Sequence, residues 1–160
     1  MPGLGLQAIF IDAIEERESS MQSTAHQPAT IASATESGAK KVCLIVDDSK
    51  VIRAVARRIL QELGFETREA ADGRAAFEAC MEVMPDVVLL DWNMPVMNGI
   101  EFLHKLRAAD GGDAPVVIFC TTENDLGHIE EALAAGSNEY IMKPFDNEII
   151  EAKFALTGLI

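Results

Sequence analysis

From Lys41 onward, short apolar runs alternate with segments in which apolar residues recur every three or four positions. A short apolar run between turn residues is typical of a buried strand, and the longer period is typical of an amphipathic helix. Strands joined by helical crossovers run parallel. We therefore expect an α/β fold of five strand–helix units, with strands at residues 42–46, 65–70, 87–90, 116–119 and 140–142.

The expected strands differ in polarity, and this difference predicts their places in the sheet. Residues 42–46, 87–90 and 116–119 are apolar throughout, as strands covered on both faces must be. Residues 65–70 are mostly polar, and the strand expected at 140–142 is short, so these two strands suit the edges of the sheet. With right-handed crossovers, this predicts a doubly wound parallel sheet in the order 2-1-3-4-5 with helices on both faces.

Cap and stop signals delimit the expected helices. Gly64 ends the first helix, and Pro85 stops the second. Asp72 and Asp146 can each cap the start of a helix. The fourth helix is expected to turn one apolar face to the sheet, made by Leu126, Ile129 and Leu133.

Residues 1–40 have a different composition and are expected to form an N-terminal extension to a domain at 41–160. Residues 19–40 are rich in Ser, Thr and Ala, which indicates a flexible linker. Residues 4–18 have the helical spacing of a short amphipathic segment. That segment is either a docking helix or an artefact of start-site choice. In the second case translation would begin at Met21, which is an alternative start, and the segment would not be part of the natural protein.

Composition excludes several classes of protein. The formal net charge of −13 disfavours contact with nucleic acid phosphates. No apolar run approaches the ~20 residues that cross a bilayer, and no secretory signal is apparent. The three cysteines are widely spaced, which suits small buried side chains in a reducing cytoplasm. The histidines lack metal-ligand spacing and are expected at the surface.

Polar residues follow the expected strands at the points where the strands end. The carboxyl ends of parallel strands share one edge of the sheet, and ligands bind where the strand order switches. The side chains expected to meet at that edge are those of Asp47, Asp48, Asp91, Thr121 and Lys143.

The residue types at this edge indicate phosphoryl transfer. Adjacent carboxylates repel one another, and a hard cation such as Mg²⁺ (or Mn²⁺) relieves the repulsion. A carboxylate can act as a nucleophile that forms an aspartyl phosphate. A lysine and a hydroxyl such as those of Lys143 and Thr121 can contact the oxygens of the transferred group.

Several separated motifs resemble the receiver domain of two-component response regulators, most closely its CheY-like single-domain type. They are Asp-Asp-Ser at 47–49, Asp-Trp-Asn-Met-Pro at 91–95 with Gly99, Thr121, and Lys-Pro-Phe at 143–145. The resemblance covers residues 41–160 and implies the same 2-1-3-4-5 sheet.

The resemblance also implies roles. Asp91 is expected to be the phosphoacceptor, and Lys143 to pair with the phosphoryl group. Mg²⁺ is expected to bind Asp47, Asp48, Asp91 and the backbone carbonyl of Asn93. The Lys143–Pro144 peptide bond is expected to be cis.

A switch is implied as well. Thr121 would move toward the phosphoryl group and let Tyr140 turn inward, which would change the face made by the fourth helix, fifth strand and fifth helix of the domain. Asn93 and Glu123 flank the path of an attacking water and are expected to tune dephosphorylation. Trp92 lies beside the site. Arg53, Arg57 and Arg58 are expected on the outer part of the first helix, either docking the phosphodonor or simply solvated.

The expected function is that of a single-domain response regulator, because no output domain follows the receiver segment in this sequence. Such a protein is not an enzyme beyond its own phosphorylation and dephosphorylation. Its partners would be a sensor histidine kinase or histidine phosphotransfer protein and a downstream target. The expected pathway is chemotaxis or motility, with no nucleic acid and no membrane insertion.

Three alternatives stay open from the sequence. A haloacid dehalogenase type of hydrolase also uses an Asp nucleophile, but after the first strand in an Asp-x-Asp pattern, whereas Asp47 and Asp48 are adjacent here. A receiver-like binding module that is never phosphorylated usually lacks one of the site residues. A phosphate sink or relay intermediate has the same site as an effector, so residue types do not separate the two.

Overall fold

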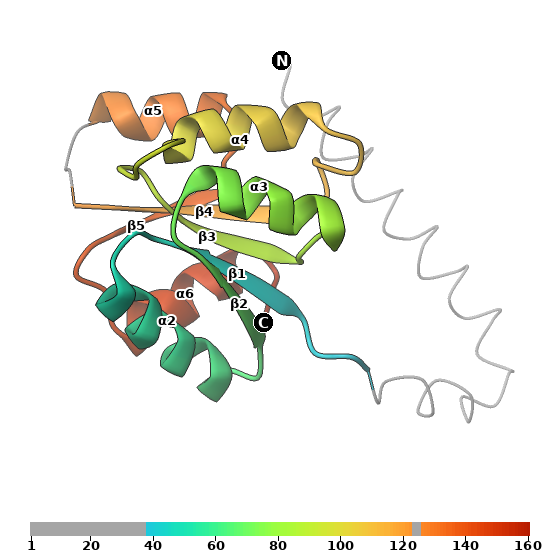
Figure 1. Cartoon of the computed structure of the whole chain (residues 1–160). Coiled ribbons are helices and arrows are strands. Elements are labelled where there is room, and N and C mark those ends of the chain that lie inside the picture. The colour runs from blue at the N-terminus through green and yellow to red at the C-terminus, as the bar shows by residue number, and fades with distance from the viewer. Residues whose placement is uncertain (1–37, 123–125) are drawn as a thin grey trace, which may run out of the picture. The chain divides into compact units, whose positions relative to one another are not determined.

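The computed structural model describes residues 38–122 and 126–160, and in them a parallel five-stranded sheet carries helices on both faces (Figure 1). The strand order is β2-β1-β3-β4-β5, which confirms the predicted order. The strands are β1 Val42–Val46, β2 Glu66–Ala70, β3 Val87–Asp91, β4 Val116–Thr121 and β5 Glu139–Met142. The helices are α2 Lys50–Glu62, α3 Gly73–Glu82, α4 Gly99–Ala108, α5 Leu126–Ala134 and α6 Asn147–Leu156.

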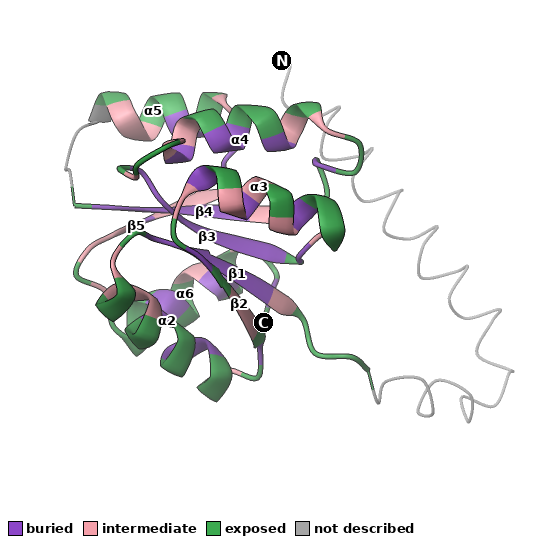
Figure 2. Ribbon diagram, viewed as in Figure 1, coloured by how far each residue is buried: buried purple, intermediate pink, exposed green. Residues whose placement is uncertain are grey.

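The helices divide the core into two layers, one on each side of the sheet. Figure 1 shows α2 and α6 on one face and α3, α4 and α5 on the other. The strands are mostly buried and the helices are exposed on their outer sides, as Figure 2 shows. The first layer centres on Leu60 and Phe154, and the second on Phe102 and Phe119. β3 is buried along its whole length, as its unbroken apolar run predicts.

Side-chain caps set where four helices begin. In each cap the side-chain oxygen accepts a hydrogen bond from the backbone N–H three residues further on. Asp72 and Asp146 cap α3 and α6, as the sequence predicts. Ser49 and Asn98 cap α2 and α4.

The inner face of α5 differs from the prediction. Leu133 is 47% exposed, whereas its neighbour Ala132 is buried at 2% exposure. The helix therefore faces the sheet with a small residue, and the larger apolar side chain lies on the surface. Successive residues of a helix are about 100° apart, so the buried face of α5 is displaced by about one residue from the predicted face.

Arg107 of α4 ties together the loops at the amino ends of β4 and β5. Its guanidinium donates to the backbone oxygens of Gly136, Gly112 and Pro115 at distances of 2.7 to 3.1 Å. It also donates to Oδ1 of Asn138, which accepts from the backbone N–H of Val117 as well. Burial lowers the pKa of Arg107, and the nearby Asp113 opposes that shift. This cluster fixes the edge of the sheet opposite the predicted site.

No helix among the described residues is long and apolar enough to cross a membrane. The predicted helix at 4–18 and the linker that follows it up to residue 37 lie outside the described residues.

Candidate functional site

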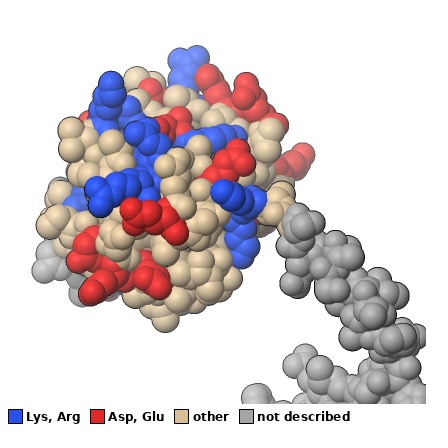
Figure 3. All heavy atoms as spheres, turned by 90° about the horizontal axis from the view of Figure 1, so that it is seen from below, with Lys and Arg blue, Asp and Glu red and all other residues tan. Residues whose placement is uncertain are grey.

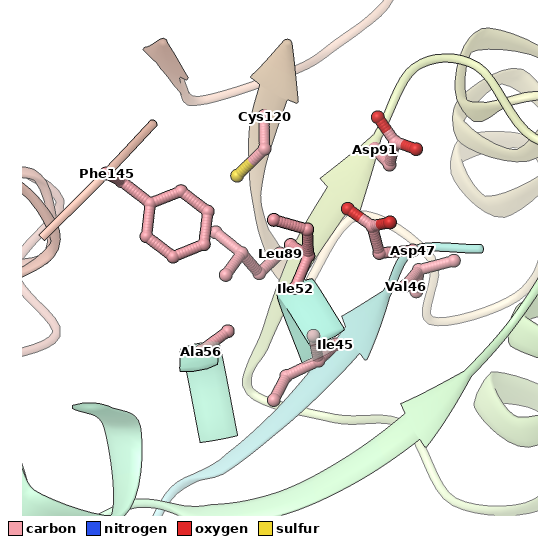
Figure 4. Close-up of a pocket in the computed structure, with 9 residues that line it drawn as sticks. All are labelled: Ile45, Val46, Asp47, Ile52, Ala56, Leu89, Asp91, Cys120 and Phe145. Carbon is pink, nitrogen blue, oxygen red and sulfur yellow. The ribbon is translucent and has the colours of Figure 1, made fainter. Parts of the chain in front are cut away.

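Three carboxylates meet at the carboxyl ends of β1 and β3. Asp47 and Asp48 follow β1, and Asp91 is the last residue of β3. Each offers an oxygen that lies within 4.8 Å of the others. Asp47 and Asp91 are buried, and Asp48 is exposed. Figure 4 shows the side chains of Asp47 and Asp91 projecting from neighbouring strand ends. The arrangement offers oxygen ligands of the kind that Mg²⁺ prefers, with an open side toward solvent.

Lys143 joins the two buried carboxylates from the end of β5. Its Nζ donates to Oδ2 of Asp47 at 2.7 Å and to Oδ1 of Asp91 at 3.1 Å. Its backbone N–H donates to the carbonyl of Thr121 at 2.8 Å, which ties the ends of β4 and β5 together. The peptide bond to Pro144 is cis, as the sequence predicts.

Burial and charge shift the pKa values at this site. Burial raises the pKa of Asp91, Lys143 opposes that rise, and the neighbouring carboxylates of Asp47 and Asp48 add to it. Burial alone would lower the pKa of Lys143, but its bonds to Asp47 and the charge of Asp91 outweigh burial and raise the pKa. Both shifts are upward because the carboxyl is buried among like charges while the amine faces opposite ones.

A hydrogen-bonded turn positions the first pair of acids. The backbone N–H of Ser49 donates to Oδ1 of Asp47 at 2.8 Å. Arg53 donates from Nη1 to the backbone carbonyl of Asp47 at 2.7 Å and from Nε to Glu69 at 3.1 Å. Arg57 holds the other oxygen of Glu69 at 2.6 Å.

Arg53 is therefore placed differently from the prediction. Its side chain is only 16% exposed, and it supports the turn that carries Asp47 and Asp48 instead of lying on an outer basic surface. Arg57 is 44% exposed at its side chain and Arg58 is 81% exposed, so the expected outer position holds for these two. Helical spacing predicts on which side of α2 Arg53 lies. It does not predict that a backbone carbonyl outside the helix, that of Asp47, is within hydrogen-bond distance.

The loop after Asp91 is tightly packed on the strand end. The backbone N–H of Gly99 donates to the carbonyl of Trp92 at 2.9 Å, and a Cβ at Gly99 would collide with the Asp91 carbonyl and lie 2.7 Å from the ring of Phe119. Only a glycine fits this approach. In the same loop Val96 has φ +69°, a conformation that β-branched residues rarely adopt.

Trp92 is buried beside Asp91 and packs on two rings. Its ring centroid lies 5.0 Å from that of Phe119 and 4.6 Å from that of His128. His104 is exposed, as expected, but the expectation of a surface position is wrong for His128, which is half-buried against Trp92. His26 lies outside the described residues. Stacking of this kind depends on tertiary contacts, which histidine spacing in the sequence does not report.

The remaining predicted site residues lie around this centre. Thr121 is buried at the carboxyl end of β4. Tyr140 is half-buried in β5, and Asn93 is exposed in the loop after β3. Glu123 lies outside the described residues. The structure therefore brings the three carboxylates, Lys143 and Thr121 to one edge of the sheet.

Below the carboxylates, the interior is closed and apolar. The cavity there has a volume of about 10 Å³, no more than a single water needs. It is lined by residues such as Ile52, Leu89, Cys120 and Phe145 (Figure 4). Burial raises the pKa of the Cys120 thiol far above its usual range, so it is a packing residue, as predicted. A reactant therefore reaches Asp91 from the solvent side.

Known proteins resemble this chain in sequence and in fold. The family model described as "Response regulator receiver domain" matches residues 43–155. The chemotaxis protein CheY1 of Helicobacter pylori strain J99 is 38% identical over 113 residues, covering 69% of this chain and 90% of CheY1. CheY-3 of Vibrio cholerae is 40% identical over 111 residues, covering 69% of this chain and 85% of CheY-3.

Solved structures agree with the sequence relatives. The chemotaxis protein CheY4 of Vibrio cholerae superposes with a TM-score of 0.70 at 34% identity, covering 76% of this chain and all of CheY4. A CheY-like receiver domain of Methanospirillum hungatei gives 0.66 at 30% identity, covering 74% of this chain and 94% of that one. The family match excludes the dehalogenase alternative. The chain belongs to the response regulator receiver domain family and is a CheY-like response regulator of two-component signalling.

Proposed function

We propose that Asp91 accepts a phosphoryl group from a phosphohistidine of a sensor kinase or phosphotransfer protein. In that step an Asp91 oxygen forms a bond to phosphorus while the bond between phosphorus and the histidine nitrogen breaks, and the nitrogen keeps the electron pair. The observation that supports it most directly is that the buried Asp91 carboxylate lies 3.1 Å from Lys143. The lysine would contact an oxygen of the transferred group, whose negative charge it would offset.

We further propose that the site takes Mg²⁺. Asp47, Asp48, Asp91 and the backbone carbonyl of Asn93 would hold it, and the clustered carboxylate oxygens fit a hard cation. A bound Mg²⁺ would neutralise charge on the phosphoryl oxygens. Contacts within the chain hold these ligands in place. Ser49 and Arg53 donate hydrogen bonds to Asp47, and Lys143 links Asp47 to Asp91.

The output of the switch is proposed to be a protein-binding face made by α5, β5 and α6. Thr121 would approach the phosphoryl group, and Tyr140 would turn inward. Asn93 and Glu123 would set the lifetime of the phosphorylated state by orienting a water. A target that prefers one form of this face would shift the population toward that form. The protein would thus signal by contact with another protein and catalyse only its own phosphorylation and dephosphorylation.

The phosphodonor is proposed to dock beside α2. A groove of about 400 Å³ lies between α2 and the start of α6, and is lined by Ala54, Val55, Arg58, Ile59, Phe145, Asp146 and Asn147. Figure 3 views the molecule from the side of α2 and α6 and shows Lys and Arg side chains beside acidic ones on this face. An exposed apolar strip with flanking charges suits a helix of a kinase or phosphotransfer protein.

The pathway is proposed from the relatives. Several of them are named as chemotaxis proteins, which supports a role in chemotaxis or motility. We also propose that residues 41–160 form the receiver domain, that residues 1–40 are an extension to it, and that the protein acts in the cytoplasm.

Incubation with a small phosphodonor and Mg²⁺, followed by intact mass measurement, tests the phosphoacceptor. The expected result is the mass gain of one phosphoryl group in the natural protein and none in Asp91→Asn. Asp72→Asn is a matched control, because it changes an Asp after another strand end and keeps a side chain that caps α3. A mass gain that persists in Asp91→Asn, or no gain in the natural protein, would overturn the proposal.

A further inference from the structure

Lys153 of α6 contacts both Tyr140 and Glu139 of the edge strand β5. Its Nζ lies 4.7 Å from the centroid of the Tyr140 ring and 2.9 Å from Oε1 of Glu139. The same oxygen of Glu139 accepts a hydrogen bond from the backbone N–H of Tyr140 at 3.0 Å. Oε1 of Glu139 therefore binds both Lys153 and the backbone N–H of Tyr140, and Lys153 in turn covers the Tyr140 ring.

The two contacts cross the edge of the sheet. Tyr140 packs against the layer that contains Phe119, on the side of α3, α4 and α5. Lys153 belongs to α6, which packs in the other layer through Ile150 and Phe154. Because β5 is the last strand of the sheet, the lysine can reach around it to the face of the ring. The ring is thus in contact with a charge from a helix of the opposite layer.

Tyr140 lies on the same face of the sheet as Thr121. In the register of β4 and β5, Phe119 is opposite Tyr140 and Thr121 is opposite Met142. Opposite residues of parallel strands point to the same face, and so do residues two apart in one strand. A movement of Thr121 toward Asp91 would therefore change the space next to the Tyr140 ring.

We infer that Lys153, held by Glu139, is a positioning residue that keeps the Tyr140 ring at the sheet edge and opposes its inward movement. The ring position seen here accompanies an Asp91 carboxylate that is paired with Lys143. Contacts that favour this ring position favour this form of Asp91, because coupling between two sites is reciprocal. The inference rests on the proposed function, and it adds a residue that sets how readily the switch moves.

The expected size of the effect follows from the strength of the contact. A cation over an aromatic face at a partly exposed site contributes enough to shift an equilibrium about two- to five-fold. Loss of Lys153 should therefore raise the apparent affinity for a phosphoryl mimic by about that factor. It should also raise the population of the inward ring by a similar ratio.

The chain suits a direct test because Tyr140 is its only tyrosine and Trp92 its only tryptophan. The protein is labelled with 3-fluorotyrosine, so that fluorine NMR reports the Tyr140 ring alone. Beryllium fluoride with Mg²⁺ is titrated as the phosphoryl mimic, and Trp92 fluorescence reports its binding. In Lys153→Met the fluorine signal is expected to move toward its mimic-bound position before any mimic is added. The affinity for the mimic is expected to rise about two- to five-fold.

Two matched variants separate this role from a general loss of charge. Lys153→Arg keeps a cation that can cover the ring and pair with Glu139, and it should behave as the natural protein does. Lys105→Met removes a similar contact, since Nζ of Lys105 lies 4.5 Å from the centroid of Phe77, which is on α3 and not in β5. It should leave both the fluorine signal and the affinity unchanged.

The outcomes distinguish the inference from the proposed function. If the natural protein binds the mimic and Lys153→Met has the same affinity and fluorine signal, Lys153 does not position the ring and the inference fails alone. Equal shifts in Lys105→Met would also overturn it. If the natural protein shows no response to the mimic in Trp92 fluorescence, both the proposed function and the inference fail.

Discussion

Nζ of Lys143 lies 2.7 Å from Oδ2 of Asp47, although 96 positions separate the two residues in the sequence. This contact is shorter than the one from the same nitrogen to Asp91, at 3.1 Å. The lysine therefore joins the acid that follows β1 to the proposed phosphoacceptor. A new group on Asp91 could keep a bond to Lys143 without breaking the bond that orients it.

Lys143→Met is expected to destabilise the fold in Mg²⁺-free buffer. It leaves Asp47 and Asp91, both almost fully buried, without their cation, and breaking such a pair costs about 3 kcal/mol. Mg²⁺ should recover more stability in the variant than in the natural protein, because it supplies the missing charge. Urea unfolding with and without Mg²⁺ measures both effects.

Lys50→Met is the control for that variant, because Lys50 is an exposed lysine at the start of α2. It should unfold within about 0.5 kcal/mol of the natural protein in either buffer. Equal stability of Lys143→Met and Lys50→Met would show that the ion pairs at the strand ends do not stabilise the fold.

Asp48→Asn is expected to weaken Mg²⁺ binding by at least about ten-fold. Loss of a residue that only supports a metal ligand already weakens binding by about 10- to 100-fold, and Asp48 is proposed to be a ligand itself. Asp48 is exposed, so the fold should keep its stability without metal. Titration of Mg²⁺ against Trp92 fluorescence measures the change, because Trp92 adjoins the carboxylates. Asp86→Asn serves as the comparison, since Asp86 contacts the backbone N–H of Val42 at the other end of the sheet. Similar affinities in the two variants would place the metal elsewhere.

Val96→Gly is expected to stabilise the protein by about 0.5–1 kcal/mol. The Val96 side chain is 75% exposed and contributes little burial, while its φ of +69° is costly for a β-branched residue and free of strain for glycine. Val51→Gly is the matched control, because Val51 is 71% exposed but lies in α2, where glycine is unfavourable. Thermal unfolding should move the two variants in opposite directions. A loss of stability in Val96→Gly would contradict the prediction.

Glu139 is expected to make a pH-dependent contribution to stability. Burial alone would raise the pKa of Glu139, but hydrogen bonds from Lys153 and from the Tyr140 backbone outweigh it and lower the pKa. A carboxyl whose pKa is lower in the folded state adds stability above its unfolded pKa and loses it as the pH falls through the folded pKa. The stability difference between the natural protein and Glu139→Gln should therefore be full at pH 7 and shrink below about pH 4.5, the ordinary value for this group.

Urea unfolding across that pH range checks the sign, because the other carboxyls titrate alike in both proteins and cancel in the difference. A difference that grows on acidification would mean that Glu139 is destabilising when ionised.

The sheet could be predicted from the sequence because its strands report their own burial. Val87–Asp91 is apolar up to its last residue and becomes the central strand, whereas the polar Glu66–Ala70 becomes an edge. Asp72 and Asp146 could be identified as caps because a cap acts on backbone three residues away. Such features depend on local pattern, which a single sequence contains in full.

The site could be predicted only in part. The meeting of Asp47, Asp91 and Lys143 follows from topology, since the carboxyl ends of parallel strands share one edge. The bond from Arg53 to the Asp47 carbonyl does not follow, because backbone oxygens carry no signal in the residue pattern. The lysine over Tyr140 was missed for a related reason: Lys153 has the spacing of a half-exposed helix residue, and only its path around the last strand brings it to the ring.

The Arg107 cluster has a consequence for the direction of any conformational change. Its bonds to Gly136, Pro115 and Asn138 fasten β4 and β5 to α4 at one end. At the other end, Thr121 and Lys143 are joined to each other across the strands. The two strands are therefore fixed to α4 at one end and to each other at the other end. A displacement of these strands would therefore be expected to be smallest near Arg107 and largest at the end that holds Thr121 and Lys143.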